Sequence, residues 1–207
     1  MTGVAYDSFA SHDQVNQSLR SQIEELLDRT GGRQPLSGKG TETGAFPPQN
    51  VYPPQTSRKQ KTEAVPAPAG GQRDVVLAGT SLGGYWAARF GNLLNLPAVL
   101  INPTIHPYQS LRRYTGHRLH NFVTRTRNTL RESVPKSYHD IERSGDFLVL
   151  LDKGDEVLDY QTALAWYEPH LPADRIIVFE GGSHRFGHME EALPHIRQFL
   201  FQHPVSR

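Results

Sequence analysis

Three side chains of the types that carry out acyl transfer occur far apart in the sequence, namely Ser81, Asp155 and His184. Ser81 is the central residue of a Gly-x-Ser-x-Gly motif that begins at Gly79. A serine hydroxyl is a weak nucleophile unless it is exposed, aligned with a base and placed beside donors for an oxyanion. A histidine can remove its proton, and a carboxylate can hold the imidazole ring and stabilise its charged form. The three residues therefore predict nucleophilic catalysis if the fold brings them together.

The residues around Ser81 are typical of a strand, a tight turn and a helix. The segment 74–78 is mostly Val, Leu and Ala, which predicts a strand buried on both faces, and the apolar segment 83–94 is compatible with a helix. A serine at the apex of such a turn, in strained backbone geometry, forms a nucleophile elbow. A glycine-rich turn without chemistry is the alternative that the motif alone leaves open.

The small residues of the motif have separate expected roles. Gly79 and Gly83 should permit the tight turn, because a Cβ at either position is expected to clash. The amide of Leu82 opens the following helix, so it should point at negative charge that develops on a substrate, with the helix dipole behind it. Leu82 is therefore a predicted oxyanion donor.

Further strands are expected after the elbow, and the candidate acid and base follow two of them. The apolar runs cover residues 96–101, 147–151 and 175–180. Asp155 comes shortly after the second run and His184 shortly after the third, and functional groups of open α/β sheets cluster beyond the carboxyl ends of strands. The order serine, acid, histidine is that of α/β-hydrolases.

Other residues compete for the roles of acid and base. Asp152 and Asp159 are alternative acids, and Asp155 can also serve as a helix cap. We favour Asp155 because the preceding glycine suits a sharp turn after the strand. His106 and His188 are alternative bases, and His188 is expected to face solvent.

Residues 74 to 200 resemble the small YqiA-like esterases of the α/β-hydrolase superfamily. The resemblance lies in segments 79–85, 96–99, 102–103, 154–160 and 180–186, in that order along the chain. It implies a sandwich fold that hydrolyses carboxylic esters, of short acyl chains, with Ser81 as nucleophile, Asp155 as acid and His184 as base.

The N-terminal segment departs from that family. Its members begin with a strand that ends in His-Gly-Phe, and the amide near the Phe supplies the second oxyanion donor. Here Asp7 and Ser8 replace His-Gly, and Phe9 is retained as the predicted donor. A carboxylate at this place opposes negative charge in the transition state, so Asp7 argues against efficient turnover. A helix is expected over residues 14–27.

Two segments interrupt the expected core. Residues 31–72 are rich in Pro and Gly, which predicts a long irregular segment that acts as a flexible tether, as an arm in a homo-oligomer or as a contact for a protein partner. Residues 104–145 are predicted to form a helical, lid-like insertion, with one amphipathic helix near residues 119–130. Its arginines either select a negatively charged part of a substrate or form an ordinary basic outer face. Tyr85, Tyr108 and Tyr160 are predicted walls of a substrate pocket or, equally, core residues.

Composition limits the remaining possibilities. The net charge of +1 argues against a nucleic-acid partner, and no apolar run approaches the length needed to cross a bilayer. The chain has no cysteine and no visible secretory signal, so we expect a cytoplasmic protein. No cofactor and no metal site are expected.

The sequence thus predicts a single α/β-hydrolase-like domain over residues 1–207. Its expected architecture is a three-layer sandwich with a mostly parallel, reduced sheet of about five strands. The expected activity is that of a serine esterase on a small-molecule ester. The alternative is a hydrolase-fold protein of little or no activity that serves as a binding or structural component.

Overall fold

The computed structural model describes residues 3–29, 75–121 and 124–202. These residues belong to one compact unit, formed by Met1–Gly32 together with Gln72–Arg207. The predicted irregular segment 31–72 lies outside the described residues.

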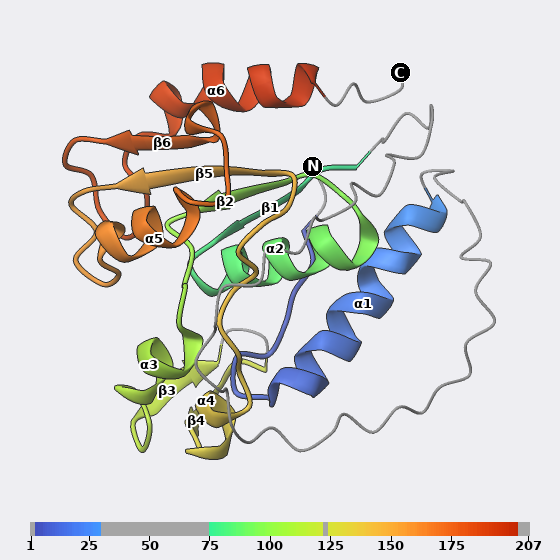
Figure 1. The fold of residues 1–207 in the computed structure, drawn as a ribbon. Helices are drawn as coiled ribbons and strands as arrows, with labels where there is room; N and C mark the ends of the chain where they lie inside the picture. The colour runs from blue at the N-terminus through green and yellow to red at the C-terminus, as the bar shows by residue number, and fades with distance from the viewer. Residues whose placement is uncertain (1–2, 30–74, 122–123, 203–207) are drawn as a thin grey trace, which may run out of the picture. The chain divides into compact units, whose positions relative to one another are not determined.

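A four-stranded parallel sheet with helices on both faces forms this unit (Figure 1). The strands lie in the order β1-β2-β5-β6. The elements in chain order are α1 (His12–Arg29), β1 (Leu77–Thr80), α2 (Leu82–Leu94), β2 (Ala98–Ile101), α3 (Pro107–Arg112), β3 (Arg118–Asn121), β4 (Thr126–Thr129), α4 (Ser133–Lys136), β5 (Phe147–Asp152), α5 (Tyr160–Tyr167), the 3-10 turn η1 (Ala173–Arg175), β6 (Ile176–Phe179) and α6 (Met189–Phe201).

The two faces of the sheet bury alternate residues of the same strands in two separate cores. Leu100 and Val149 point into the core shared with α1, α2 and α5, whereas Val99 and Leu148 point into the core shared with α6. The central strands β2 and β5 are buried along their whole length, which explains why they read as unbroken apolar runs. The expected three-layer, parallel α/β architecture is confirmed, with four strands of the sheet in the described residues against an expectation of about five.

The first two helices lie on the same side of the sheet (Figure 1). Helix α1 contributes Val15, Leu19 and Ile23, whose spacing of four residues places them on one helical face. Helix α2 ends at Leu94, and the next residue, Asn95, adopts the left-handed conformation typical of a helix terminus.

Strand β1 differs from the prediction of burial on both faces. Its four residues alternate between half-buried and exposed. Within the described residues β1 is an edge strand, paired on one side with β2, and an edge strand is covered less completely than a central one.

The insertion 104–145 is not the predicted amphipathic helix. Strands β3 and β4 pair antiparallel across the region where the helix was expected, and the short helices α3 and α4 flank this hairpin. Thr124, Thr126 and Thr129 favour extended backbone, and Arg125 adopts a positive φ of 56° at the turn. The apolar spacing near residues 119–130 therefore reflects a hairpin with one partly buried face.

Candidate active site

Ser81 sits at the turn between β1 and α2, in a backbone conformation that non-glycine residues rarely adopt. Its φ is 54° and its ψ is −123°. The Ser81 amide donates to the Ile101 carbonyl at 3.0 Å, and the Thr104 amide donates to the Ser81 carbonyl at 3.0 Å. These bonds to the end of β2 hold the strained turn in place, so the geometry is that of the expected elbow.

The prediction that Gly79 and Gly83 permit the tight turn is correct for only one of the two residues. A Cβ on Gly79 would lie 2.1 Å from the Gly83 carbonyl oxygen, so Gly79 is obligatory as expected. A Cβ on Gly83 would meet nothing within 4 Å, which corrects the prediction for that residue. The second close approach is at Gly84, where a Cβ would lie 3.0 Å from the Pro103 Cβ.

Asp155 and His184 are brought together by the loops that follow β5 and β6. The ring Nδ1 of His184 lies 3.0 and 2.9 Å from the two carboxylate oxygens of Asp155. The carboxylate also accepts the amides of Val157 and Leu158, each at 2.8 Å. The Asp155 side chain is 2% exposed and that of His184 is 22% exposed, so the ring reaches the surface while its partner stays buried. Because His184 Nδ1 is bonded to Asp155, Nε2 is the ring nitrogen that can accept a proton.

The competing acids occupy other places. Asp159 caps α5 by accepting the Gln161 amide at 3.0 Å. Asp152 is fully buried at the end of β5, where it accepts a bond from His188 Nδ1 at 2.7 Å. In the part of the chain that the structure describes, neither carboxylate is hydrogen-bonded to the ring of His184.

The competing histidines are also paired with carboxylates of their own. The His106 Nδ1 lies 2.6 Å from Asp140 Oδ1. The expectation that His188 faces solvent is wrong, because its ring stacks on Phe179 at 5.2 Å and an angle of 8°. The hydrogen bond to Asp152 raises the pKa of His188 above its ordinary value of 6.5.

A network that the sequence did not reveal holds the loop carrying His184. Asp152 Oδ2 accepts the amides of Ser183 at 3.1 Å and Gly187 at 2.7 Å. Buried Asn102, at the end of β2, accepts the Asp152 amide at 2.9 Å and donates to the Ser183 carbonyl at 3.1 Å. The adjacent amide of His184 donates to Glu156 at 3.0 Å, and this bond lowers the pKa of that carboxyl. The ends of two strands thereby fix the loop on which His184 lies.

The hydroxyl of Ser81 lies 3.4 Å from the hydroxyl of Thr104. No hydrogen bond joins Ser81 to the His184 ring in the residues that the structure describes. Bonds of this kind are often long in free enzymes and tighten only in the substrate complex.

The two predicted oxyanion donors differ in their surroundings. Leu82 is the first residue of α2, so its backbone amide lies at the N-terminus of the helix. Its side chain is buried. The Phe9 amide donates to Asp7 Oδ1 at 2.9 Å. Asp7, one of the two residues that replace the family's His-Gly, therefore already accepts the hydrogen bond that this amide would donate to an oxyanion. Residues 3–11 form no strand, in contrast to the first strand of that family.

The predicted pocket walls are scattered. Tyr85 is 2% exposed and packs edge-on against Trp86 and Tyr138, and burial raises its pKa to about 12. Of its two expected roles, pocket wall and core residue, Tyr85 therefore has the second. Tyr108 is exposed on α3, and Tyr160 begins α5 with the Lys153 ammonium 5.9 Å from its ring centre.

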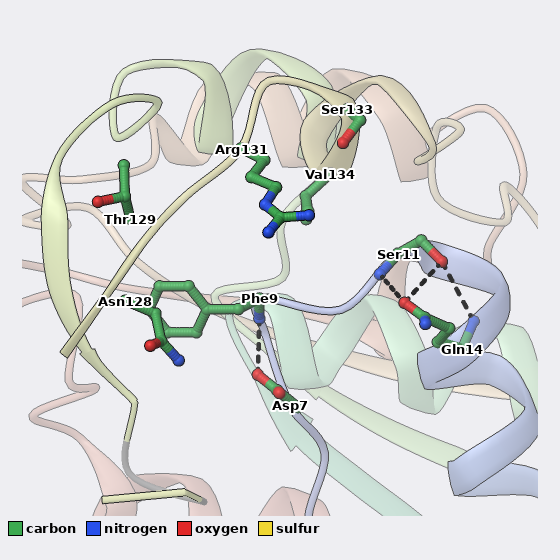
Figure 2. A pocket seen from close by; sticks show the side chains of 9 residues that line it. All are labelled: Asp7, Phe9, Ser11, Gln14, Asn128, Thr129, Arg131, Ser133 and Val134. Carbon is green, nitrogen blue, oxygen red and sulfur yellow. Dashed lines mark hydrogen bonds between the residues drawn. The ribbon is translucent and has the colours of Figure 1, made fainter. Parts of the chain in front are cut away.

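A cavity of about 540 Å³ lies beside Phe9 (Figure 2). Neither Ser81 nor His184 is among its lining residues, which come from the N-terminal segment and from the end of the insertion: Asp7, Phe9, Ser11, Gln14, Asn128, Thr129, Arg131, Ser133 and Val134. The arginine-rich composition of the insertion was the available signal for this cavity.

A parallel α/β sheet, a strained serine between strand and helix and a buried aspartate on a histidine ring together define an α/β-hydrolase-type scaffold. The chain belongs to the family described as Uncharacterised protein family (UPF0227), which it matches over residues 47–201. The expected family resemblance is confirmed at this level.

Several known proteins are similar to the chain. The UPF0227 protein VP0969 of Vibrio parahaemolyticus is 28% identical over 136 residues, and a UPF0227 protein of a Shewanella species is 29% identical over 124 residues. Each match covers 60% of this chain and 64% of the relative, so the chain spans less than two thirds of their length. A solved structure of an alpha-beta serine hydrolase homologue from Coxiella burnetii aligns with a TM-score of 0.36 and 20% identity, over 61% of this chain and 50% of that one. A likeness at this level does not bear on activity.

Proposed function

We propose that the protein is a serine hydrolase of carboxylic esters, with Ser81, His184 and Asp155 as its catalytic residues. The observation that carries the proposal is the pair formed by the buried Asp155 carboxylate and His184 Nδ1 at 2.9 Å. The strained backbone of Ser81 supports it independently. Both features follow the carboxyl ends of strands in one parallel sheet, where catalytic groups of α/β proteins gather.

In the proposed reaction, Ser81 Oγ attacks the acyl carbon of an ester while its proton passes to His184 Nε2. Asp155 keeps the proton of the other nitrogen in place and stabilises the imidazolium. The ring then protonates the departing alcohol, which leaves an acyl group on Ser81. A water molecule attacks this acyl group and gives a proton to Nε2. The bond to Ser81 Oγ then breaks, Nε2 returns the proton to Oγ, and the carboxylic acid is released. The Leu82 amide stabilises the tetrahedral oxyanion in both steps.

A second candidate function is binding by a scaffold of little or no catalytic activity. Two observations favour it: Asp7 occupies the Phe9 amide at 2.9 Å, and the Ser81 hydroxyl is directed to Thr104. The loss of one oxyanion donor lowers the rate by about 10²–10³-fold. An enzyme slowed in this way and a binding protein without activity would have the same arrangement of Asp7 and Phe9.

Hydrolysis of p-nitrophenyl esters with short acyl chains separates the two functions. The enzyme should release p-nitrophenol, and Ser81→Ala should abolish release without changing the melting temperature. Ser144→Ala, in an exposed loop, is the matched control and should keep the full rate. Equal rates in the wild type and in Ser81→Ala would instead support the binding function.

A further inference from the structure

The cavity beside Phe9 has the size of a ligand site. Ser81, Asp155 and His184 are not among its lining residues, whereas Phe9, the predicted second oxyanion donor, is one of them. Its volume of about 540 Å³ falls in the range of about 300–1,000 Å³ that small-molecule pockets occupy. Three stretches of chain form its walls: residues 7–14, which lead into α1 and include its first turn, residues 128–129 at the end of β4, and residues 131–134, which lead into α4 and include its start. A ligand in this cavity would therefore contact residues that are more than a hundred positions apart in sequence.

A positive charge without a partner extends into the cavity. Figure 2 shows the Arg131 side chain reaching from the connection before α4 toward the segment that contains Phe9 and Ser11. Within the described residues the exposed Arg131 guanidinium makes no hydrogen bond or ion pair, which leaves its donors free for a ligand. A guanidinium presents five donors in a planar fork that matches a carboxylate or phosphate group.

The remaining walls add neutral donors and a small apolar surface. The Ser11 hydroxyl contacts Gln14 Oε1 at 3.1 Å, which leaves the Gln14 amide nitrogen available as a donor toward a ligand. The Ser133 hydroxyl has no recorded partner among the described residues. Buried Val134 and half-buried Phe9 supply the apolar part of the wall.

One carboxylate lines the same cavity, and one of its oxygens is held by two hydrogen bonds. Asp7 Oδ1 accepts the Phe9 amide at 2.9 Å and the Asn121 side-chain amide at 2.7 Å. These two bonds hold the Asp7 side chain against the wall of the cavity. Figure 2 shows the bond from the Phe9 amide. The anion of a ligand should consequently bind at the Arg131 end, away from Asp7.

We propose that this cavity binds a small oxyanion ligand, a carboxylate or phosphate group on a short apolar body, with Arg131 as the anchoring residue. Arg131 pairs with the anion, Ser133 and Gln14 donate to its remaining oxygens, and Phe9 and Val134 pack on the apolar body. Binding of this ligand requires neither Ser81 nor turnover, so a binding measurement tests the site without depending on hydrolysis.

Ligand-observed NMR titration of the full chain tests this site with benzoate, phenyl phosphate and neutral benzamide as probes. We expect saturable binding of at least one of the two anions, weaker binding of benzamide, and a loss of about tenfold in anion affinity in Arg131→Gln. Arg131→Lys should bind with intermediate affinity, because it keeps the charge but loses the planar fork. A preference for benzoate or for phenyl phosphate identifies the anion class.

The matched control is Arg127→Gln, an exposed arginine of β4 that does not line the cavity. It should bind the anions as the wild type does, and both glutamine variants should melt at the wild-type temperature. The proposal is overturned if neither anion saturates, if benzamide binds as tightly as benzoate, or if Arg131→Gln and Arg127→Gln have equal affinities.

Discussion

Asp152→Asn should destabilise the protein, because this buried carboxylate ties the His184 loop to the end of β5. Its side chain is fully buried and accepts three donors: the Ser183 amide, the Gly187 amide and His188 Nδ1. Asparagine has a single acceptor oxygen, and its amide group carries two N–H donors in place of the second oxygen. At least one of the three donors must then lose its acceptor and face another donor.

The expected loss follows from these contacts. An unsatisfied buried donor costs about 1–3 kcal/mol, and breaking a buried charged pair costs about 3–5 kcal/mol. We expect Asp152→Asn to lower the free energy of unfolding by about 2–4 kcal/mol, because the amide retains some of the bonds. Asp174→Asn, an exposed carboxylate in η1, is the control and should change stability by less than about 0.5 kcal/mol.

The loss should also depend on pH. The pKa of His188 is raised by its hydrogen bond to Asp152 and, more weakly, by the charges of Asp152 and Glu191. A raised pKa in the folded state contributes stability that is fully present below the unfolded value of 6.5 and is lost as pH rises through the folded value. Asp152→Asn should thus cost more at pH values below 6.5 than in mildly alkaline solution.

Urea unfolding followed by circular dichroism at several pH values measures both effects. A loss below about 0.5 kcal/mol would refute the argument that Asp152 holds the loop. A large loss that does not change with pH would show that the pair with His188 is not part of the interaction.

Four other substitutions, the last two tested as a pair, have definite expected results. Asp155→Asn should lower esterase activity by about 10²–10⁴-fold in a protein that still folds, because the asparagine oxygen can still accept the Val157 and Leu158 amides; retained activity would remove Asp155 from the mechanism. Asp7→Gly should free the Phe9 amide and raise the esterase rate, and an unchanged rate would show that this amide is not an oxyanion donor. Gly79→Ala should fail to fold or lose more than about 3 kcal/mol, whereas Gly83→Ala should fold normally, because only the first added Cβ meets backbone; thermal melting of the pair tests this, and equal stabilities would contradict it.

Local patterns predicted most of the scaffold. The unbroken apolar runs of β2 and β5 give their burial directly, since both strands are covered on both faces. The glycine-rich turn at Ser81 and the apolar spacing of α1 are likewise local signals. The pairing of Asp155 with His184 could be anticipated because both follow the carboxyl ends of parallel strands.

Other features depend on contacts between distant residues, which local patterns do not encode. Nothing near His188 indicates that its ring stacks on Phe179 and binds Asp152. The need for glycine at position 84 arises from Pro103 on another strand end. The hairpin of β3 and β4 was mistaken for a helix, because apolar residues a few positions apart fit either structure over so short a segment.

Nothing in the described residues is long and apolar enough to form a membrane-spanning helix. The catalytic proposal is tested most directly on the full chain, by mass spectrometry after incubation with a fluorophosphonate. The probe reacts with a serine only where a base and an oxyanion site activate it.

The account predicts one adduct on the peptide that contains Ser81, and no adduct in His184→Ala or Ser81→Ala. A folded wild-type sample without any adduct, or with an adduct that persists in His184→Ala, would contradict it.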